Sequence, residues 1–194
     1  MSTFEFVLIP LAIILGFAVS EVLKGWGQQV RSRHRRSSHL VQIASSAFIL
    51  FFCMVYLWAL WFLRDAAWSF PLFFLVTLPG FAAALAAHIS RVDTSTEAAP
   101  VLEQYFQNSR PVYSLLALFP ISIITVSYIP GVREQVPDLP SLLTVTLLRL
   151  TLLGLILSLA WSKSLRYHAA ALCLLWLVLI GLLVRIGILT KYVA

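Results

Sequence analysis

The chain has 194 residues, of which 60% are apolar and only 11% are charged, and its mean hydropathy is +0.92. Because roughly a quarter of the residues of a soluble domain are charged, this composition excludes an ordinary water-soluble fold. A net charge of +6 can indicate nucleic acid as a partner, but the longest basic run is short and contains no aromatic stacking residue. We therefore expect lipid around most side chains and no nucleic-acid binding.

Six apolar segments approach the length of about 20 residues that a helix needs to cross the hydrocarbon core. In chain order they cover residues 4–23, 40–63, 68–90, 112–129, 139–162 and 169–190. The first is expected to be a retained helix and not a cleaved signal peptide, because Glu5 precedes its apolar stretch and the positive charge follows it. No Ser- or Gly-rich linker separates the segments. The sequence thus predicts one all-α domain, a polytopic transmembrane bundle of about six helices.

The distribution of Lys and Arg between the loops predicts the orientation. Nine lie on the side reached after the first, third and fifth segments, and three on the other side: Lys24, Arg31, Arg33, Arg35, Arg36, Arg91, Arg110, Lys163 and Arg166 against Arg64, Arg133 and Lys191. Cytoplasmic loops accumulate Lys and Arg. Both termini are therefore predicted to be non-cytoplasmic.

The long loop after the third segment contains a short amphipathic stretch at residues 100–108. Val101, Leu102, Tyr105 and Phe106 share one helical face, and Glu103, Gln104 and Gln107 lie away from it. This pattern predicts a short helix resting on the cytoplasmic membrane surface. A docking helix for a partner protein is the alternative.

A basic run follows the first segment. Its arginines could bind anionic lipid head groups, or they could act only as topology determinants; they are Arg31, Arg33, Arg35 and Arg36.

Ionisable groups inside membrane helices are costly and usually face the protein interior or a water-filled space. Arg149 lies near the middle of the fifth segment, so it needs a partner or a wet cavity. Glu5, within the apolar start of the first segment, is the most attractive partner, and Arg185 of the sixth segment could join the same group. Either an anion or substrate site or a structural ion pair would account for such a layer.

A second polar layer is predicted at the cytoplasmic ends of the helices. Glu21 lies in the last turn of the first segment, His88 in the last turn of the third, and His168 at the start of the sixth. A carboxylate with histidines at one level could relay protons or bind a cation. Helix ends wetted by head groups are the alternative, and a haem between His88 and His168 would lack any further motif.

Proline and small residues predict irregular backbone and close helix packing. Pro10, Pro79 and Pro120 each remove a backbone donor inside a segment. Gly80 with Ala84 in the third segment, and the stripe Ala12/Gly16/Ser20 in the first, permit backbones to approach closely. These two helices are expected to make the tightest contact in the bundle.

Three features together resemble small uncharacterised bacterial multipass membrane proteins. They are residues 15–25, which read Leu-Gly-Phe-Ala-Val-Ser-Glu-Val-Leu-Lys-Gly, the arginine cluster after them and the Trp-rich end of the second segment. The resemblance covers the first third of the chain and implies no activity. It implies a bacterial inner (plasma) membrane protein in which Glu21 belongs to the shared pattern.

The pattern as a whole favours a small channel or transporter for an ion or small solute. The alternative is a non-catalytic accessory subunit of a larger respiratory, photosynthetic or secretion complex. The usual catalytic motifs are missing, so we lean against an enzyme and predict no cofactor and no metal site. The expected partners are the lipid bilayer, anionic lipids at the basic run, and either further copies of the chain or other membrane subunits.

Overall fold

The computed structural model describes residues 2–31, 37–64, 66–91, 101–129 and 139–191. Its elements in chain order are α1 (Thr3–Arg31), α2 (Ser37–Leu60), the 3-10 turn η1 (Trp61–Leu63), α3 (Phe70–Ile89), α4 (Val101–Leu116), α5 (Leu118–Ser127), α6 (Leu139–Trp161) and α7 (Leu165–Lys191). The described residues contain no strand. The prediction of an all-α bundle is confirmed.

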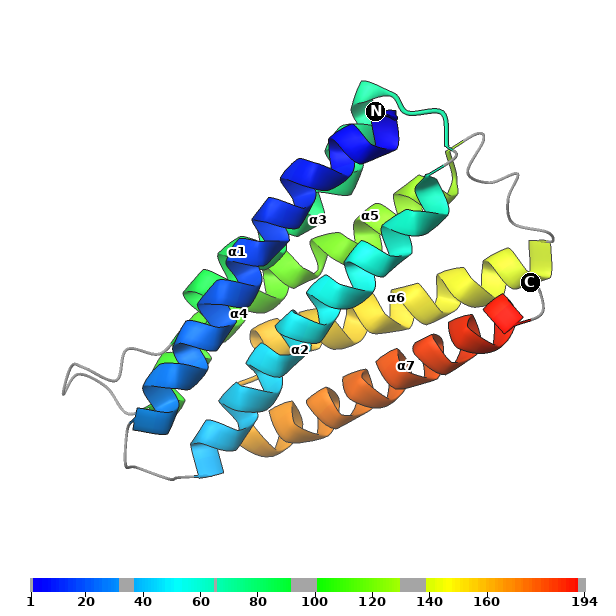
Figure 1. Cartoon of the computed structure of the whole chain (residues 1–194). Helices are drawn as coiled ribbons and strands as arrows, with labels where there is room; N and C mark the ends of the chain where they lie inside the picture. The colour runs from blue at the N-terminus through cyan, green and yellow to red at the C-terminus, as the bar shows by residue number, and fades with distance from the viewer. Residues whose placement is uncertain (1, 32–36, 65, 92–100, 130–138, 192–194) are drawn as a thin grey trace.

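The helices run up and down the bundle, with α4 and α5 following one another as a single rod (Figure 1). We call the end where α1 finishes and α2 starts the inner end, since its loops are predicted to be cytoplasmic, and the opposite end the outer end. The first turn of α1 and the last turn of α7 both lie at the outer end (Figure 1). The two termini are therefore on the same side of the bundle.

Four helices are long and apolar enough to cross a membrane. They span Thr3–Gln29, Leu40–Leu60, Phe70–Ile89 and Leu102–Ser127, and within the described residues α6 and α7 add shorter apolar helices at Thr146–Trp161 and Leu165–Gly181. Many large apolar side chains on these helices are exposed, among them Phe17, Trp58, Phe74 and Leu177. Lipid is the natural environment for such a surface, and the chain is a membrane protein.

Residues 100–108 do not form a separate surface helix. From Val101 onwards they are the first turns of α4, which continues without a break to Leu116. Tyr105 is only 6% exposed and packs inside the bundle. Of the described residues on the apolar face, Tyr105 is buried within the bundle and Leu102 and Phe106 are partly buried.

The contact between α1 and α3 is the most extensive between any two helices of the described chain, as expected. A Cβ atom on Gly80 would clash with the side chain of Leu11, so this glycine permits the approach. On α1, however, the expected small-residue stripe is not used. Gly16 has open space around it, and the buried face is formed instead by Leu11, Leu15, Ala18 and Val22.

The three prolines have different consequences. Pro10 and Pro79 lie within helices that continue through them. Pro120 lies just after the interruption at Ala117 that separates α4 from α5. A proline ring clashes with the carbonyl of the fourth residue before it, here Leu116, which accounts for the break at this point.

Packing at Gly80 generates a test with an internal control. Gly80→Leu should lower the free energy of unfolding by about 1–3 kcal/mol relative to Gly16→Leu, because only the first forces a side chain into an occupied space. Both changes replace a helical glycine by the same residue, so the difference between them isolates packing. Thermal or denaturant unfolding in mild detergent measures it. Equal effects would mean that α1 and α3 do not meet at Gly80.

Candidate functional site

Buried polar side chains gather at the inner end of the bundle. Gln42, Ser45 and Ser46 on α2, Ser109 on α4 and His168 on α7 are all less than 9% exposed. Because an unpaired buried polar group is costly, such a concentration requires an organised set of partners. The inner end is therefore the candidate functional site.

Glu21 on α1 organises the first part of this site. Its carboxylate accepts hydrogen bonds from Lys24 Nζ at 2.9 Å, from Arg91 at 2.8 Å and from His88 Nδ1 at 3.1 Å. The side chain of Glu21 is 14% exposed, whereas that of His88 is 66% exposed. The structure thus brings the predicted Glu21 and His88 together and joins α1, which continues ten residues past Glu21, to the C-terminal end of α3.

His168, the third member of the predicted layer, belongs to a separate chain of hydrogen bonds. Ser45 Oγ lies 2.8 Å from the Tyr113 hydroxyl, which lies 3.1 Å from the Tyr105 hydroxyl. The Tyr105 hydroxyl lies 2.8 Å from Nδ1 of His168, and Nε2 of His168 lies 3.0 Å from the carbonyl of Ser162. This chain links α2, α4 and the start of α7.

The carbonyl of Ser162 fixes the direction of every bond in the chain. A carbonyl only accepts, so Nε2 of His168 carries a hydrogen, and Nδ1 of the neutral ring must accept one from Tyr105. Tyr105 has a single hydroxyl hydrogen, so Tyr113 must donate to it. Ser45 must then donate to Tyr113. The hydrogens therefore all point from α2 towards α7.

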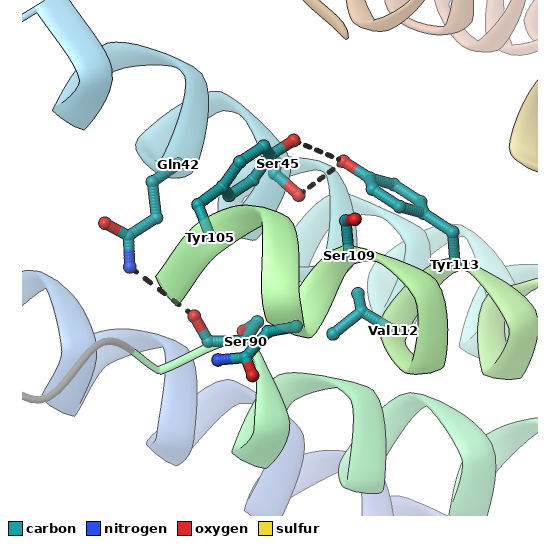
Figure 2. A pocket seen from close by; sticks show the side chains of 8 residues that line it. Gln42, Ser45, Ser90, Tyr105, Ser109, Val112 and Tyr113 are labelled. Atoms are coloured by element: carbon teal, nitrogen blue, oxygen red, sulfur yellow. Dashed lines mark hydrogen bonds between the residues drawn. The ribbon is translucent and has the colours of Figure 1, made fainter. Parts of the chain in front are cut away.

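Two small cavities are both lined by Gln42. The α2/α4 cavity (Ser45, Ser90, Ser109, Tyr113 and their neighbours) and the α1/α3 cavity (Glu21, Trp26, Ser46, Arg91 and their neighbours) each have a volume of about 10 Å³. That is near the lower limit for one water molecule. Figure 2 shows the first cavity, with Gln42 Nε2 donating to the Ser90 carbonyl at 3.4 Å.

A tryptophan joins α1 to α2 beside the α1/α3 cavity. Trp26 Nε1 donates to Ser46 Oγ at 2.7 Å, and Ser46 Oγ donates to the Ile43 carbonyl at 3.0 Å. Hydrogen bonds consequently connect α1 with α2, α2 with α3, and α2 with α4 and α7, all at one end of the bundle.

Arg149 lies apart from this site, on α6. Its guanidinium donates to Ser127 Oγ at 2.6 Å, and Ser127 Oγ in turn donates to the Ile123 carbonyl at 2.8 Å. Ser127 is the last residue of α5, so the positive charge also lies at the negative end of that helix dipole. Among the described residues, a hydroxyl and a helix end thus take the place of the expected carboxylate.

Glu5, the expected partner of Arg149, instead caps its own helix. Its carboxylate accepts from the Ser2 backbone N–H at 2.7 Å, and its N–H donates to Ser2 Oγ at 3.2 Å. Between these two described residues, Glu5 and Arg149, the structure records no ion pair. Arg185 lies within α7, but its side chain is outside the described part.

The predicted lipid-binding arginines fall mostly outside the described residues. Arg33, Arg35 and Arg36 lie there entirely, and only the backbone of Arg31, the last residue of α1, is described. Lipid binding at this run stays a prediction.

Sequence reasoning did not single out the residues at the centre of the site. Tyr105, Ser109 and Tyr113 recur at intervals of four residues, which places them on one face of a helix, and Gln42 precedes Ser45 by three residues on α2. This spacing is the sequence pattern from which a polar face shared by these residues could have been predicted. It was missed because residues 100–108 were interpreted as a surface segment, apart from the span that contains Tyr113.

Comparison of the chain with protein-family models, with curated proteins and with solved structures finds no match.

The hydrogen-bond chain predicts that loss of the Tyr113 hydroxyl lowers the stability of the protein. Tyr113→Phe should lower the free energy of unfolding by about 1–3 kcal/mol, because the buried hydroxyls on either side each lose a partner. Tyr128→Phe is the matched control: Tyr128 is 47% exposed and its hydroxyl makes one bond of 3.3 Å to Thr146. Denaturant unfolding in detergent compares the two. A loss at Tyr113 no greater than that at Tyr128 would contradict the network.

Removing the Ser127 hydroxyl and removing the Arg149 charge should have different effects on the free energy of unfolding. Ser127→Ala leaves the half-buried guanidinium without its hydroxyl partner and should cost about 1–3 kcal/mol. Arg149→Leu removes the charge itself and should cost less or even stabilise the protein. Unfolding measurements on both variants and on the double variant check this. A larger loss for Arg149→Leu would show that the arginine has a further partner.

Proposed function

We propose that this membrane protein moves a small ion or polar solute across the bilayer, and that the inner end of the bundle is where the cargo binds. The observation that carries the proposal is the concentration of buried polar groups around two cavities that share Gln42. A bundle that served only as a membrane anchor would have no need to keep such groups inside it, since each costs free energy unless it is paired.

The arrangement of charges supports an entry for the cargo at this end. Glu21 and Arg91 line the α1/α3 cavity, with side chains 14% and 29% exposed, and the more exposed Lys24 is bound to Glu21. In the neighbouring α2/α4 cavity, which shares Gln42 with the first, the described polar groups are uncharged, among them the hydroxyls of Ser45 and Ser109. Charged groups beside a neutral polar cavity are suited to attracting a small polar species and then removing its water.

The break between α4 and α5 supports movement of one cavity wall. α4 carries Tyr105, Ser109 and Tyr113 and ends at Leu116, where Pro120 interrupts the backbone hydrogen bonds. Broken helices next to a central site are a feature of transporters. Bending at Ala117 would shift the wall formed by α4 while α5 stays packed against α3 and α6.

Reconstitution into liposomes tests the proposal directly. We expect the purified chain to pass Na⁺, K⁺ or Cl⁻ along an imposed gradient, reported by trapped fluorescent indicators. Gln42→Leu should lower this flux at least tenfold, because Gln42 forms part of both cavity walls. Gln107→Leu is the matched control, since Gln107 is exposed and bonds only to Glu103 among the recorded contacts of the described chain.

Absence of flux for all three ions, together with a foreign membrane subunit that purifies in fixed ratio with the chain, would overturn the proposal in favour of an accessory subunit. Mass spectrometry of the protein purified in mild detergent provides this second readout. Equal losses of flux for the two glutamine variants would instead show that the path avoids the inner-end cavities.

A further inference from the structure

The α2/α4 cavity is lined by hydroxyl groups whose hydrogens are already used elsewhere. Ser90 Oγ donates to the Ala87 carbonyl at 2.8 Å, and Ser109 Oγ donates to the Phe106 carbonyl at 2.8 Å. Ser45 must donate to Tyr113, because the direction of its bond is set by the histidine at the far end of the chain. Each serine oxygen therefore offers the cavity lone pairs and no hydrogen.

The backbone adds to this negative character. Ser90 is the C-cap residue of α3, so the last turn of that helix brings the negative end of its dipole to the cavity wall. Arg91, which follows Ser90 in the chain, is bound to Glu21 and lines the α1/α3 cavity, and Arg110, which follows Ser109, is exposed. The described residues that line the cavity are thus uncharged: besides the serines and one helix end, they include the two tyrosines, Val112 and the carboxamides of Gln42 and Asn108.

We propose that the α2/α4 cavity is a binding site for a single monovalent cation such as Na⁺, held by the oxygens of Ser45, Ser90 and Ser109. Oxygen ligands select hard cations, and the absence of a carboxylate among the described residues that line this cavity favours a single charge over the double charge of Ca²⁺ or Mg²⁺. The volume of about 10 Å³ admits one ion without its hydration shell.

The direction of the hydrogen-bond chain makes Tyr105 a positioning residue for this site. In Tyr105→Phe the hydroxyl of Tyr113 loses its acceptor and can donate back to Ser45. The hydrogen of Ser45 is then released towards the cavity, where it would oppose a cation. One oxygen atom removed from α4 should thus weaken cation binding although all three serine oxygens remain in place.

The role of the site in transport rests on the proposed function, but cation binding can be measured without any flux. The experiment follows thermal unfolding of the purified full-length chain in detergent at increasing NaCl, against equal concentrations of choline chloride to hold ionic strength constant. A ligand that binds only the folded state raises the unfolding temperature. We expect a saturable rise in sodium that choline does not produce.

Two variants and one control make the result specific. Ser109→Ala and Tyr105→Phe should each raise the sodium concentration needed for half of the effect at least tenfold. Ser122→Ala, at a buried serine of α5 that lines neither cavity, should leave it unchanged. A variant that is less stable but keeps the full sodium response counts against the proposal, because a purely structural role lowers stability equally in both salts.

Identical unfolding temperatures of the unmodified protein in sodium and in choline would overturn the cation site. Flux of K⁺ or Cl⁻ in that case would leave the transport proposal standing, so the two failures are distinguishable. A sodium response without any flux would keep the cation site and remove its role in transport.

Discussion

Polar groups inside a bilayer must find their partners within the protein, since hydrocarbon offers none. This constraint accounts for both polar regions of the structure. At the outer end, the charge of Arg149 is held by one serine and the end of one helix. At the inner end, many uncharged groups satisfy one another across α1, α2, α3, α4 and α7. The first arrangement serves a single costly group, whereas the second keeps a set of groups buried around open space.

The bond between His168 and the Ser162 carbonyl has consequences beyond its own neighbourhood. Because the carbonyl cannot donate, it selects one tautomer of a histidine that is fully buried. That choice passes through the single hydrogens of two tyrosines and ends at a serine on another helix. A short turn between α6 and α7 therefore decides what kind of ligand a cavity between α2 and α4 can accept.

Hydropathy was enough to predict the helices, because the length of an apolar run and the thickness of a bilayer are directly comparable. It also predicted depth: Glu21 and His88 were expected at one level, and they are in contact. The depth of a residue in the membrane does not determine the direction in which its side chain points, however. Which way a side chain points around the bundle depends on how the helices pack, so the sequence favours Glu5 as a partner of Arg149, whereas the recorded partner is Ser127. For the same reason the cavity-lining serines could not be recognised from the sequence.

Gln42 lines both cavities at the inner end. Its Nε2 donates to the Ser90 carbonyl, and turning the carboxamide over would set Oε1 against that carbonyl, so the orientation is fixed. Its Oε1 is then left buried, with no hydrogen-bond partner among the described residues. A buried acceptor without a partner costs free energy, and a cavity adjoins Gln42 on either side. A site that keeps such an acceptor beside open space is better explained by a ligand or water that binds there than by packing alone.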